Sequence, residues 1–408
     1  MEELLYLVHR IPYPPNKGDK IRSYHLLKHL SRNYKVHLGA FVDDPEDWKY
    51  AQSVMDMVSG EVKLVSLSPG WARLRSTFGL LRGQPLSAQY YKNTKLKNWV
   101  SQLIANRPIR HALVFSSTMS QYVTPYSKLN RIIDFVDIDS DKWRQYSERK
   151  SWPMSWVYQR EARALFAFER GIAGIFDASV FVSRAEAELF QKLAPECASR
   201  VSFYNNGVDL EYFSPAHVCD TPYPPGERVL VFTGAMDYWA NVDAVIWFAR
   251  EVFPVLRTRF PELRFCIVGS RPPQEVRALA GGGIIVTGSV ADIRPYVAHA
   301  AISVAPLRIA RGIQNKVLEA MAMAKPVVVS PQALEGIDAD AGREVILAND
   351  AAEFIETIAS QLVQPNRTIG VAARRRMEQA YSWDNSFRRL DSLFAQPRRF
   401  QEQSIKPG

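Results

Sequence analysis

A strand, a glycine-bearing turn, a helix and a second strand follow one another between residues 301 and 329. Residues 301–307 (AISVAPL) form a short apolar run typical of a buried strand, and Gly312 then interrupts the chain. Residues 316–323 have the composition of a helix, and residues 327–329 are three valines. This order is that of a βαβ unit, which belongs to the parallel sheets of α/β proteins.

The start of this helix is a candidate phosphate site, because free backbone N–H groups and the positive end of the helix dipole gather there. Lys316 lies in the first turns, and Glu319 follows three residues later on the same face. An ammonium and a carboxylate so placed suit a diphosphate beside a hydroxylated ring, as in a nucleotide sugar. The alternative is an ordinary exposed ion pair on a helix surface.

The same alternation of strands and helices runs through the whole chain, and 408 residues are enough for two domains of about 200. The predicted strands are residues 4–8, 36–42, 112–115, 131–138, 178–182 and 201–204, then 228–233, 263–268, 284–286 and 302–305. A Pro-rich stretch, TPYPPG at residues 221–226, favours a linker between about residues 206 and 227. The sequence thus predicts two doubly wound α/β domains, at residues 1–206 and 207–383, with residues 384–408 as a final helix and tail.

Charge is distributed unevenly. Residues 62–133 contain 11 Lys and Arg and no Asp or Glu, whereas the whole chain has a net charge of +9, so the remainder carries 9 − 11 = −2. Such a segment suits an anionic membrane surface or a phosphorylated acceptor, or it is a solvated face. No nucleic-acid partner is expected, because no recognised binding motif accompanies the charge.

The compartment is expected to be the cytoplasm, with a peripheral position on the inner face of the cytoplasmic membrane as an option. Three cysteines without metal-ligand spacing fit a reduced setting. The N-terminus reads as a strand rather than a signal peptide, and no run of 18 apolar residues predicts a membrane span.

Polar residues also collect at the predicted carboxyl ends of strands in the first half, where open α/β sheets bind ligands. The loop after the first strand carries Gly18, Asp19, Lys20 and Arg22; Ser116 and Ser117 follow residues 112–115; and Asp137 and Asp139 follow residues 131–138. The two aspartates are candidates for a base or for binding sugar hydroxyls. A metal site is not expected, because the spacing lacks the Gly and Glu of a calcium loop.

Several separated pieces together resemble the retaining GT-B glycosyltransferases of family 4. They are VSRAEAELF (182–190), NNGVDLEYFSP (205–215), VFTGAMDYWANVDAVIWF (231–248), FCIVGS (265–270), VTGSVADIRPYVAHA (286–300) and KVLEAMAMAKPVV (316–328). Two further pieces, RIPYPPNKGDKIRSYHLLKHL and DFVDIDSDKW, look like the bacterial sugar transferases associated with exopolysaccharide and PEP-CTERM systems.

The resemblance implies two Rossmann-like domains that face each other across a cleft, with a nucleotide sugar on the C-terminal one and the acceptor, a glycan or a polyprenyl-linked sugar, on the N-terminal one. Glu319 would bind the ribose, Gly312 and Ile313 the diphosphate, and Ser289 and Val290 the base. Gly234 and Lys316 would lie beside the phosphates, and Gly18 would close on the donor. The candidates for binding the acceptor are Asp19, Lys20, Arg22, Ser116 and Ser117. No further cofactor is implied.

The chain departs from the family pattern at three places. Arg311 stands where the family has a second Glu, eight residues before Glu319. No Lys follows the turn at Gly234, so Arg308, Arg311 and Lys316 are the expected substitutes at the diphosphate. Ala324 stands where a Gly usually ends the helix, at a strain of roughly 1–2 kcal/mol if the residue is left-handed.

The expected reaction is metal-independent glycosyl transfer, for which cations must stabilise the leaving diphosphate. Arg311 and Lys316 are the predicted catalytic cations, and Asp137 or Asp139 is predicted to orient or deprotonate the acceptor. A sugar-nucleotide epimerase and a non-catalytic binding protein remain alternatives. An NAD-dependent oxidoreductase is disfavoured, because no G-x-G-x-x-G follows a strand.

Overall fold

Two compact units make up the chain, which the computed structural model describes over residues 1–15, 18–68, 70, 85–148, 151–217, 220–310 and 312–395. The first unit contains residues 1–205 together with the chain from Phe387 onward, and the second contains Asn206–Ser386. Helix α17 (Trp383–Ala395) therefore begins in the second unit and continues in the first. The sequence places the corresponding boundaries at residues 206 and 384.

The first unit is built on a parallel sheet with the strand order β3-β2-β1-β4-β5-β6-β7. Its strands are β1 (Glu3–Val8), β2 (Lys35–Val42), β3 (Val62–Ser66), β4 (Ile109–Phe115), β5 (Asn130–Val136), β6 (Ala178–Phe181) and β7 (Val201–Phe203). Its helices are α1 (Gly18–Asn33), α2 (Ala51–Met55), α4 (Leu86–Tyr90), α5 (Thr94–Asn106), α6 (Asp139–Glu148), α7 (Met154–Ile175) and α8 (Arg184–Leu193), with short 3-10 turns η1 (Pro45–Tyr50), η2 (Ser117–Tyr122) and η3 (Pro195–Arg200).

The second unit repeats this topology, with the strand order β10-β9-β8-β11-β12-β13. Its strands are β8 (Arg228–Thr233), β9 (Leu263–Val268), β10 (Ile284–Gly288), β11 (Ile302–Ala305), β12 (Val327–Val329) and β13 (Ile346–Leu347). Its helices are α9 (Trp239–Trp247), a π turn η4 (Phe248–Val252), α10 (Phe253–Arg259), α11 (Gln274–Arg277), α12 (Arg294–His299), α13 (Asn315–Ala322), α14 (Pro331–Leu334), α15 (Ala351–Val363) and α16 (Arg367–Ala380).

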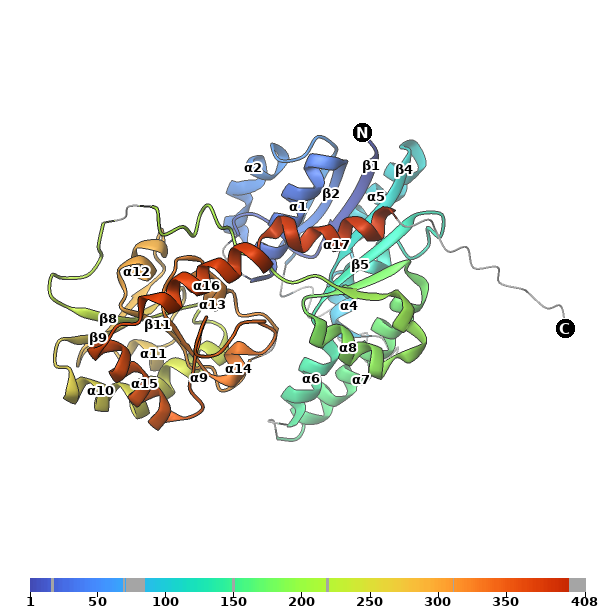
Figure 1. Cartoon of the computed structure of the whole chain (residues 1–408). Coiled ribbons are helices and arrows are strands. Elements are labelled where there is room, and N and C mark those ends of the chain that lie inside the picture. The colour runs from blue at the N-terminus through green and yellow to red at the C-terminus, as the bar shows by residue number, and fades with distance from the viewer. Residues whose placement is uncertain are drawn as a thin grey trace. The chain divides into compact units, whose positions relative to one another are not determined.

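Continuous apolar runs explain the central strands, because helices lie on both faces of each sheet and leave no polar side (Figure 1). Five of the six residues of β1 are buried, as are five of the six residues of β8. In both sheets the order reverses beside the first strand, between β1 and β4 and between β8 and β11. These two switch points are where such folds bind ligands, at the carboxyl ends of the strands.

The prediction of doubly wound α/β architecture is confirmed, and the predicted strands are present with shifts of one or two residues at most ends. Two strands were missed, β3 and β13, which form the outer edges of the sheets. Residues 71–84 of the basic segment 62–133 lie outside the described residues, and the expectation that this segment contacts an anionic membrane surface stays a prediction.

Candidate functional site

The loops that leave β8 and β11 lie side by side at the switch point of the second sheet. The two strands are paired and parallel, so their carboxyl ends lie at the same edge. Gly234 follows β8, and the chain that follows β11 leads into α13. A Cβ placed on Gly234 would lie 3.2 Å from Cε of Lys316, so the structure brings these two predicted donor residues together.

Glycines allow the neighbouring strand-end loops to pack tightly. The Gly234 N–H donates to the carbonyl of Val268 at 2.9 Å, which ties the loop after β8 to β9. A Cβ on Gly269, the residue that follows β9, would lie 1.8 Å from the carbonyl oxygen of Gly234. Only glycine fits at that position, and the close approach fixes the loop that faces Lys316.

Lys316 lies in the first turn of α13, where neutral groups surround its ammonium. Its Nζ donates to Oδ1 of Asn241 at 3.0 Å and lies 5.3 Å from the ring centre of Phe232. Desolvation lowers the pKa of Lys316 to about 8, although the negative charge of Glu319 opposes the shift. No carboxylate of the described residues forms an ion pair with Lys316. The site therefore holds a desolvated cation that an anionic ligand would stabilise.

Glu319 lies one turn further along α13 and is half-buried. Burial raises the pKa of Glu319 to about 7, against the opposing effect of the Lys316 charge. Within the described ranges, no donor hydrogen-bonds to its carboxylate. A carboxylate that is partly buried without donors is suited to accept hydrogen bonds from the hydroxyls of a ligand.

The start of α13 presents backbone N–H groups that its N-cap residue leaves uncapped. Gln314 occupies that position, and its side chain donates instead to the carbonyl of Gly312 at 3.3 Å. Gly312 has φ 64°, a left-handed conformation that favours glycine, and Ile313 next to it is buried. Arg311, the residue that departs from the family pattern, lies outside the described residues.

Three other predicted donor residues, Ser289, Val290 and Arg308, form no hydrogen bond or ion pair with Lys316 among the described residues. Ser289 and Val290 follow the edge strand β10, with Ser289 exposed and Val290 half-buried. Arg308 pairs with Asp243 of α9, with Nε 3.0 Å from Oδ2. Their roles at a donor stay predictions.

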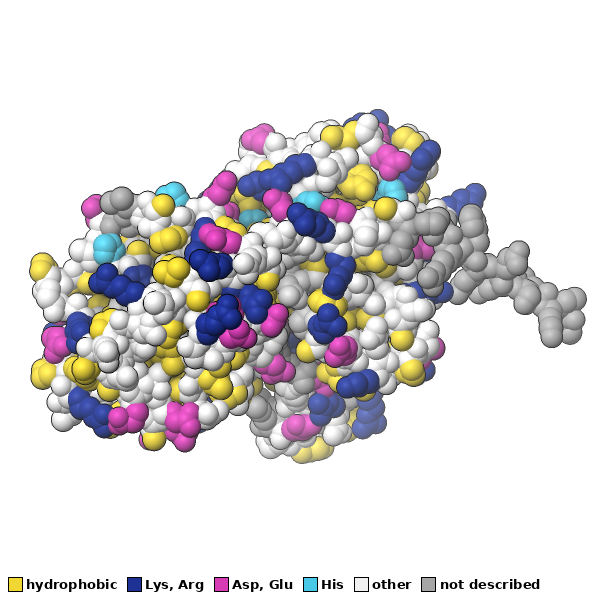
Figure 2. All heavy atoms as spheres, viewed as in Figure 1, with side chains coloured by type: hydrophobic (Ala, Val, Ile, Leu, Met, Phe, Trp, Pro, Cys, Tyr) yellow, Lys and Arg dark blue, Asp and Glu magenta, His cyan; other side chains and the backbone are white. Residues whose placement is uncertain are grey.

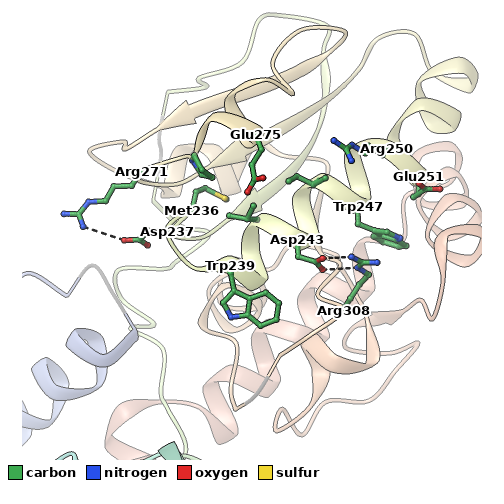
Figure 3. Close-up of a pocket in the computed structure, with 13 residues that line it drawn as sticks. Met236, Asp237, Trp239, Asp243, Trp247, Arg250, Glu251, Arg271, Glu275 and Arg308 are labelled. Atoms are coloured by element: carbon green, nitrogen blue, oxygen red, sulfur yellow. Dashed lines mark hydrogen bonds and ion pairs between the residues drawn. The ribbon is translucent and has the colours of Figure 1, made fainter. Parts of the chain in front are cut away.

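Arg308 also lines a hollow of about 770 Å³ along α9, together with Trp239 and Trp247 (Figure 3). Neither Lys316 nor Glu319 is among its lining residues. The hollow is therefore separate from the candidate phosphate site, which we place at the start of α13 because the switch point and the desolvated cation coincide there.

In the first unit, Asp137 and Asp139 follow β5 and share one cation that the sequence analysis missed. Nζ of Lys142 lies 2.7 Å from Oδ2 of Asp137 and 3.3 Å from Oδ1 of Asp139. Burial alone would lower the pKa of Lys142, but the two aspartates outweigh it and raise the pKa well above its usual value. Both aspartates keep some exposed surface, so the structure leaves them available to a ligand.

Two of the residues predicted to bind an acceptor are structural. Arg22 has no exposed surface: its Nε donates to Oδ2 of Asp134 at 2.9 Å, and its guanidinium stacks 3.6 Å from the ring centre of Tyr204. Lys20 is 3% exposed and pairs with Asp47 at 2.6 Å. Both cations are thus paired with carboxylates inside the unit, and their contact with an acceptor stays a prediction.

Gly18 and Asp19 open α1 at the carboxyl end of β1, as predicted. Oδ2 of Asp19 accepts from Nη1 of Arg10 at 2.8 Å and lies 3.4 Å from Nε2 of His9. Burial alone would raise the pKa of Asp19, but His9 and Arg10 outweigh it and hold the pKa well below the usual range. Asp19 is therefore an ionised carboxylate in a fixed network, and its contact with an acceptor stays a prediction.

Ser116 and Ser117 follow β4, beside the end of β1 at the switch point of the first sheet. Ser116 has φ 77°, which is uncommon for a residue with a side chain. Ser117 is 2% exposed, and its hydroxyl has no hydrogen-bond partner among the described residues. Nδ1 of His9 is likewise buried without a partner, and the His9 ring stacks on Phe115 at 5.8 Å.

His9, Arg10, Asn241 and Lys142 were thus missed by the sequence analysis. A usable signal existed for His9 and Arg10, because they directly follow the buried strand β1. No local pattern marks Asn241, whose contact with Lys316 joins residues 75 positions apart.

Among the described residues, no three His, Cys, Asp or Glu side chains gather as a metal site would require. None of the helices in the described ranges combines the length and hydropathy needed to cross a bilayer.

Part of the sequence is similar to known glycosyltransferases. Residues 227–364, which lie in the second unit, match the family described as "Glycosyl transferases group 1". A phosphatidyl-myo-inositol mannosyltransferase of Mycolicibacterium smegmatis is 32% identical over 155 residues, which are 37% of this chain and 37% of that protein. The second unit therefore contains a glycosyltransferase group 1 domain, and the chain aligns with little more than a third of this relative.

Solved structures resemble the chain over nearly its whole length. Sucrose-phosphate synthase from Thermosynechococcus elongatus has a TM-score of 0.72 at 14% identity and covers 97% of this chain and 98% of its own. HepE of Anabaena, in complex with UDP-glucose, has a TM-score of 0.67 at 15% identity and covers 97% of this chain and 100% of its own. The fold is therefore GT-B. The narrower resemblance to exopolysaccharide-associated transferases stays a prediction.

Proposed function

We propose that this protein transfers a glycosyl group from a nucleotide diphosphate sugar to a glycan or lipid-linked acceptor in bacterial exopolysaccharide synthesis. The observation that carries the proposal is the placement of Lys316 at the start of α13, beside Gly234 and at the switch point of the second sheet. The group 1 glycosyltransferase domain, the mannosyltransferase relative and the UDP-glucose complex of HepE support it. The reaction is proposed to retain the anomeric configuration and to need no metal ion.

The leaving group determines which residues are needed. When the bond from the anomeric carbon to the diphosphate breaks, negative charge grows on the diphosphate, and cations and N–H donors already in place stabilise it. Lys316 and the uncapped N–H groups of α13 supply this role, with Arg311 as a further cation. Arg308 would have to leave its ion pair with Asp243 to take part. Glu319 accepts from the ribose hydroxyls, and Ser289 and Val290 hold the base.

Asp137 or Asp139 is proposed to orient the acceptor hydroxyl. Both carboxylates contact Nζ of Lys142, which holds them in place. In a retaining reaction on one face of the sugar, the departing phosphate can take the acceptor proton, so the aspartate then serves for positioning. The protein is proposed to work in the cytoplasm, at the inner face of the membrane that carries a lipid-linked acceptor.

A thermal-shift screen tests the donor site without knowledge of the acceptor. Nucleoside diphosphates and their sugars, including UDP-glucose and GDP-mannose, are added to the wild type and to Lys316→Ala in the presence of EDTA. A ligand that binds the folded state raises its stability by about 2.7 kcal/mol at 100 times Kd, so one nucleotide should shift Tm by several degrees in the wild type only. If no nucleotide shifts the wild type, the proposed function is wrong.

A further inference from the structure

The free end of the α6–α7 hairpin exposes large apolar side chains. The two helices pack along each other and project from the first sheet (Figure 1). At their shared end Trp152 is 81% exposed, Met154 is 44% exposed and Trp156 is 59% exposed. Neither indole contacts another ring or a hydrogen-bond acceptor of the described residues. Three such side chains within five positions mark a surface that meets an apolar environment.

Other aromatic residues already pack α6 against α7, so the fold does not need the exposed tryptophans for this contact. Trp143 of α6 lies 5.2 Å from Tyr158 of α7, ring centre to ring centre, and this pair joins the two helices. Trp152 and Trp156 lie outside that contact. No contact within the described part of the first unit explains why these two side chains are exposed.

On α7 the acidic side chains are buried, and the exposed charged side chains are basic. Its glutamates, Glu161 and Glu169, are each 1% exposed, because Glu161 accepts from the backbone N–H of Leu86 at 3.0 Å and Glu169 from the hydroxyl of Ser140 at 2.5 Å. The exposed charged residues of α7 are therefore Arg163 and Arg170, and Arg160 is half-buried. On the face drawn in Figure 2, Lys and Arg side chains (dark blue) lie among Asp and Glu side chains (magenta).

Two of these arginines have acidic neighbours. Arg160 lies 3.4 Å from the buried Glu161, and Arg170 pairs with Glu196. Arg163, which is exposed, forms no ion pair with a described carboxylate and contacts only Gln159 at 3.5 Å. Its charge is the one most available to an external anion.

We propose that the end of the α6–α7 hairpin, formed by Trp152, Met154 and Trp156, binds an anionic phospholipid surface, with Arg163 two turns further along α7 as its cation. Tryptophan favours the boundary between lipid headgroups and acyl chains, and a guanidinium pairs with phosphate. A projecting helix end suits insertion between headgroups, whereas a protein partner requires a broad surface of about 800 Å². The purpose of the contact, access to a lipid-linked acceptor, rests on the proposed function, but the contact itself does not.

Vesicle co-sedimentation of the full-length protein, without donor or acceptor, tests the contact. Vesicles of phosphatidylcholine with about one-third phosphatidylglycerol should bind the wild type, and binding should weaken as salt rises. Trp152→Ser with Trp156→Ser should reduce the partition coefficient about tenfold or more, because two apolar side chains lose their burial. Arg163→Gln should reduce it about fivefold on anionic vesicles and little on pure phosphatidylcholine.

Trp48→Ser is the matched control, since Trp48 is 40% exposed on η1 of the same unit and far along the chain from the hairpin. It should leave binding unchanged, and the hairpin variants should keep the wild-type Tm. The proposal is wrong if the double variant binds vesicles like the wild type, if Trp48→Ser weakens binding equally, or if the double variant instead abolishes a protein dimer. Any of these results leaves the nucleotide-binding test untouched.

Discussion

At the scale of single residues, the pair formed by Lys316 and Glu319 makes donor binding depend on pH. A diphosphate needs Lys316 protonated, which holds below a pKa of about 8, and hydroxyl donors favour Glu319 ionised, which holds above a pKa of about 7. The affinity for a nucleotide sugar should therefore peak between pH 7 and 8 and fall by up to about tenfold per pH unit on each side. Calorimetry from pH 5.5 to 9.5 measures this profile.

A substitution of Glu319 tests whether this residue causes the loss of affinity on the acidic side of the profile. Glu319→Gln should remove the acidic limb and reduce the peak affinity about tenfold, because a neutral amide accepts hydrogen bonds less strongly than a carboxylate. The alkaline limb should persist in this variant. An affinity that is flat with pH in the wild type would contradict the assignment of both residues.

The residue scale also shows what local spacing can and cannot predict. The spacing of Lys316 and Glu319 was sufficient to predict that both side chains lie on one face of a helix, because residues three positions apart are neighbours on a helix surface. The burial of Arg22 was not predictable, because its partner Asp134 is 112 positions away and only the folded sheet brings the two together. The pairing of Lys20 was not predictable for the same reason, since its partner Asp47 lies in a different element.

At the scale of elements, Glu169 couples the α6–α7 hairpin to pH. Burial and the charge of Asp139 raise the pKa of Glu169 to about 8. The folded state therefore holds a proton that the unfolded chain releases above about pH 4.5, so the free energy of unfolding should rise as pH falls from 8 toward 5.

Glu169→Gln should remove this dependence. Relative to the variant, the wild type should gain about 1–3 kcal/mol in unfolding free energy between pH 8 and 5.5. Urea unfolding at both pH values measures it, with Glu148→Gln on the exposed side of α6 as the control. Equal pH slopes for the wild type and Glu169→Gln would show that Glu169 is ionised in the folded protein.

The end of α13 carries a backbone strain that one substitution should relieve. Ala324 has φ 53°, the left-handed conformation expected if it replaces a helix-ending glycine. Ala324→Gly should stabilise the protein by about 0.5–1 kcal/mol, since the relieved strain exceeds the added flexibility of the unfolded chain. Thermal unfolding measures it, and Ala322→Gly within the helix should instead destabilise by about 1 kcal/mol. A lower Tm for Ala324→Gly would contradict the strain.

Elements differ in how well the sequence predicts them. The central strands were predicted almost to the residue, because burial on both faces produces continuous apolar runs such as β8 and β9. The edge strand β3 was missed because most of its residues are only half-buried, and β13 because it has only two residues. Helices α9 and α10 are separated by the π turn η4, which no composition signal marks.

At the scale of the whole molecule, the repeated strand order gives each unit a switch point at the carboxyl ends of its strands, where such folds bind ligands. The alternation of strands and helices was sufficient to predict this architecture, as the resemblance of the chain to GT-B structures confirms. The candidate donor residues could be predicted where a motif fixed their spacing. Partners such as Asn241 and Lys142 could not, because tertiary contacts define them.

Calorimetric titration of the stabilising nucleotide sugar into wild type, Lys316→Ala and Lys325→Ala tests the central claim most directly. Lys325 is the matched control, because it is also a half-buried lysine of the second unit, and its Nζ donates to the carbonyl of Ala300 at 3.1 Å. Loss of Lys316 should weaken binding about 10- to 100-fold, the range of a charge-assisted hydrogen bond, and loss of Lys325 should leave it unchanged. Equal affinities for the wild type and Lys316→Ala would contradict a donor site at the start of α13.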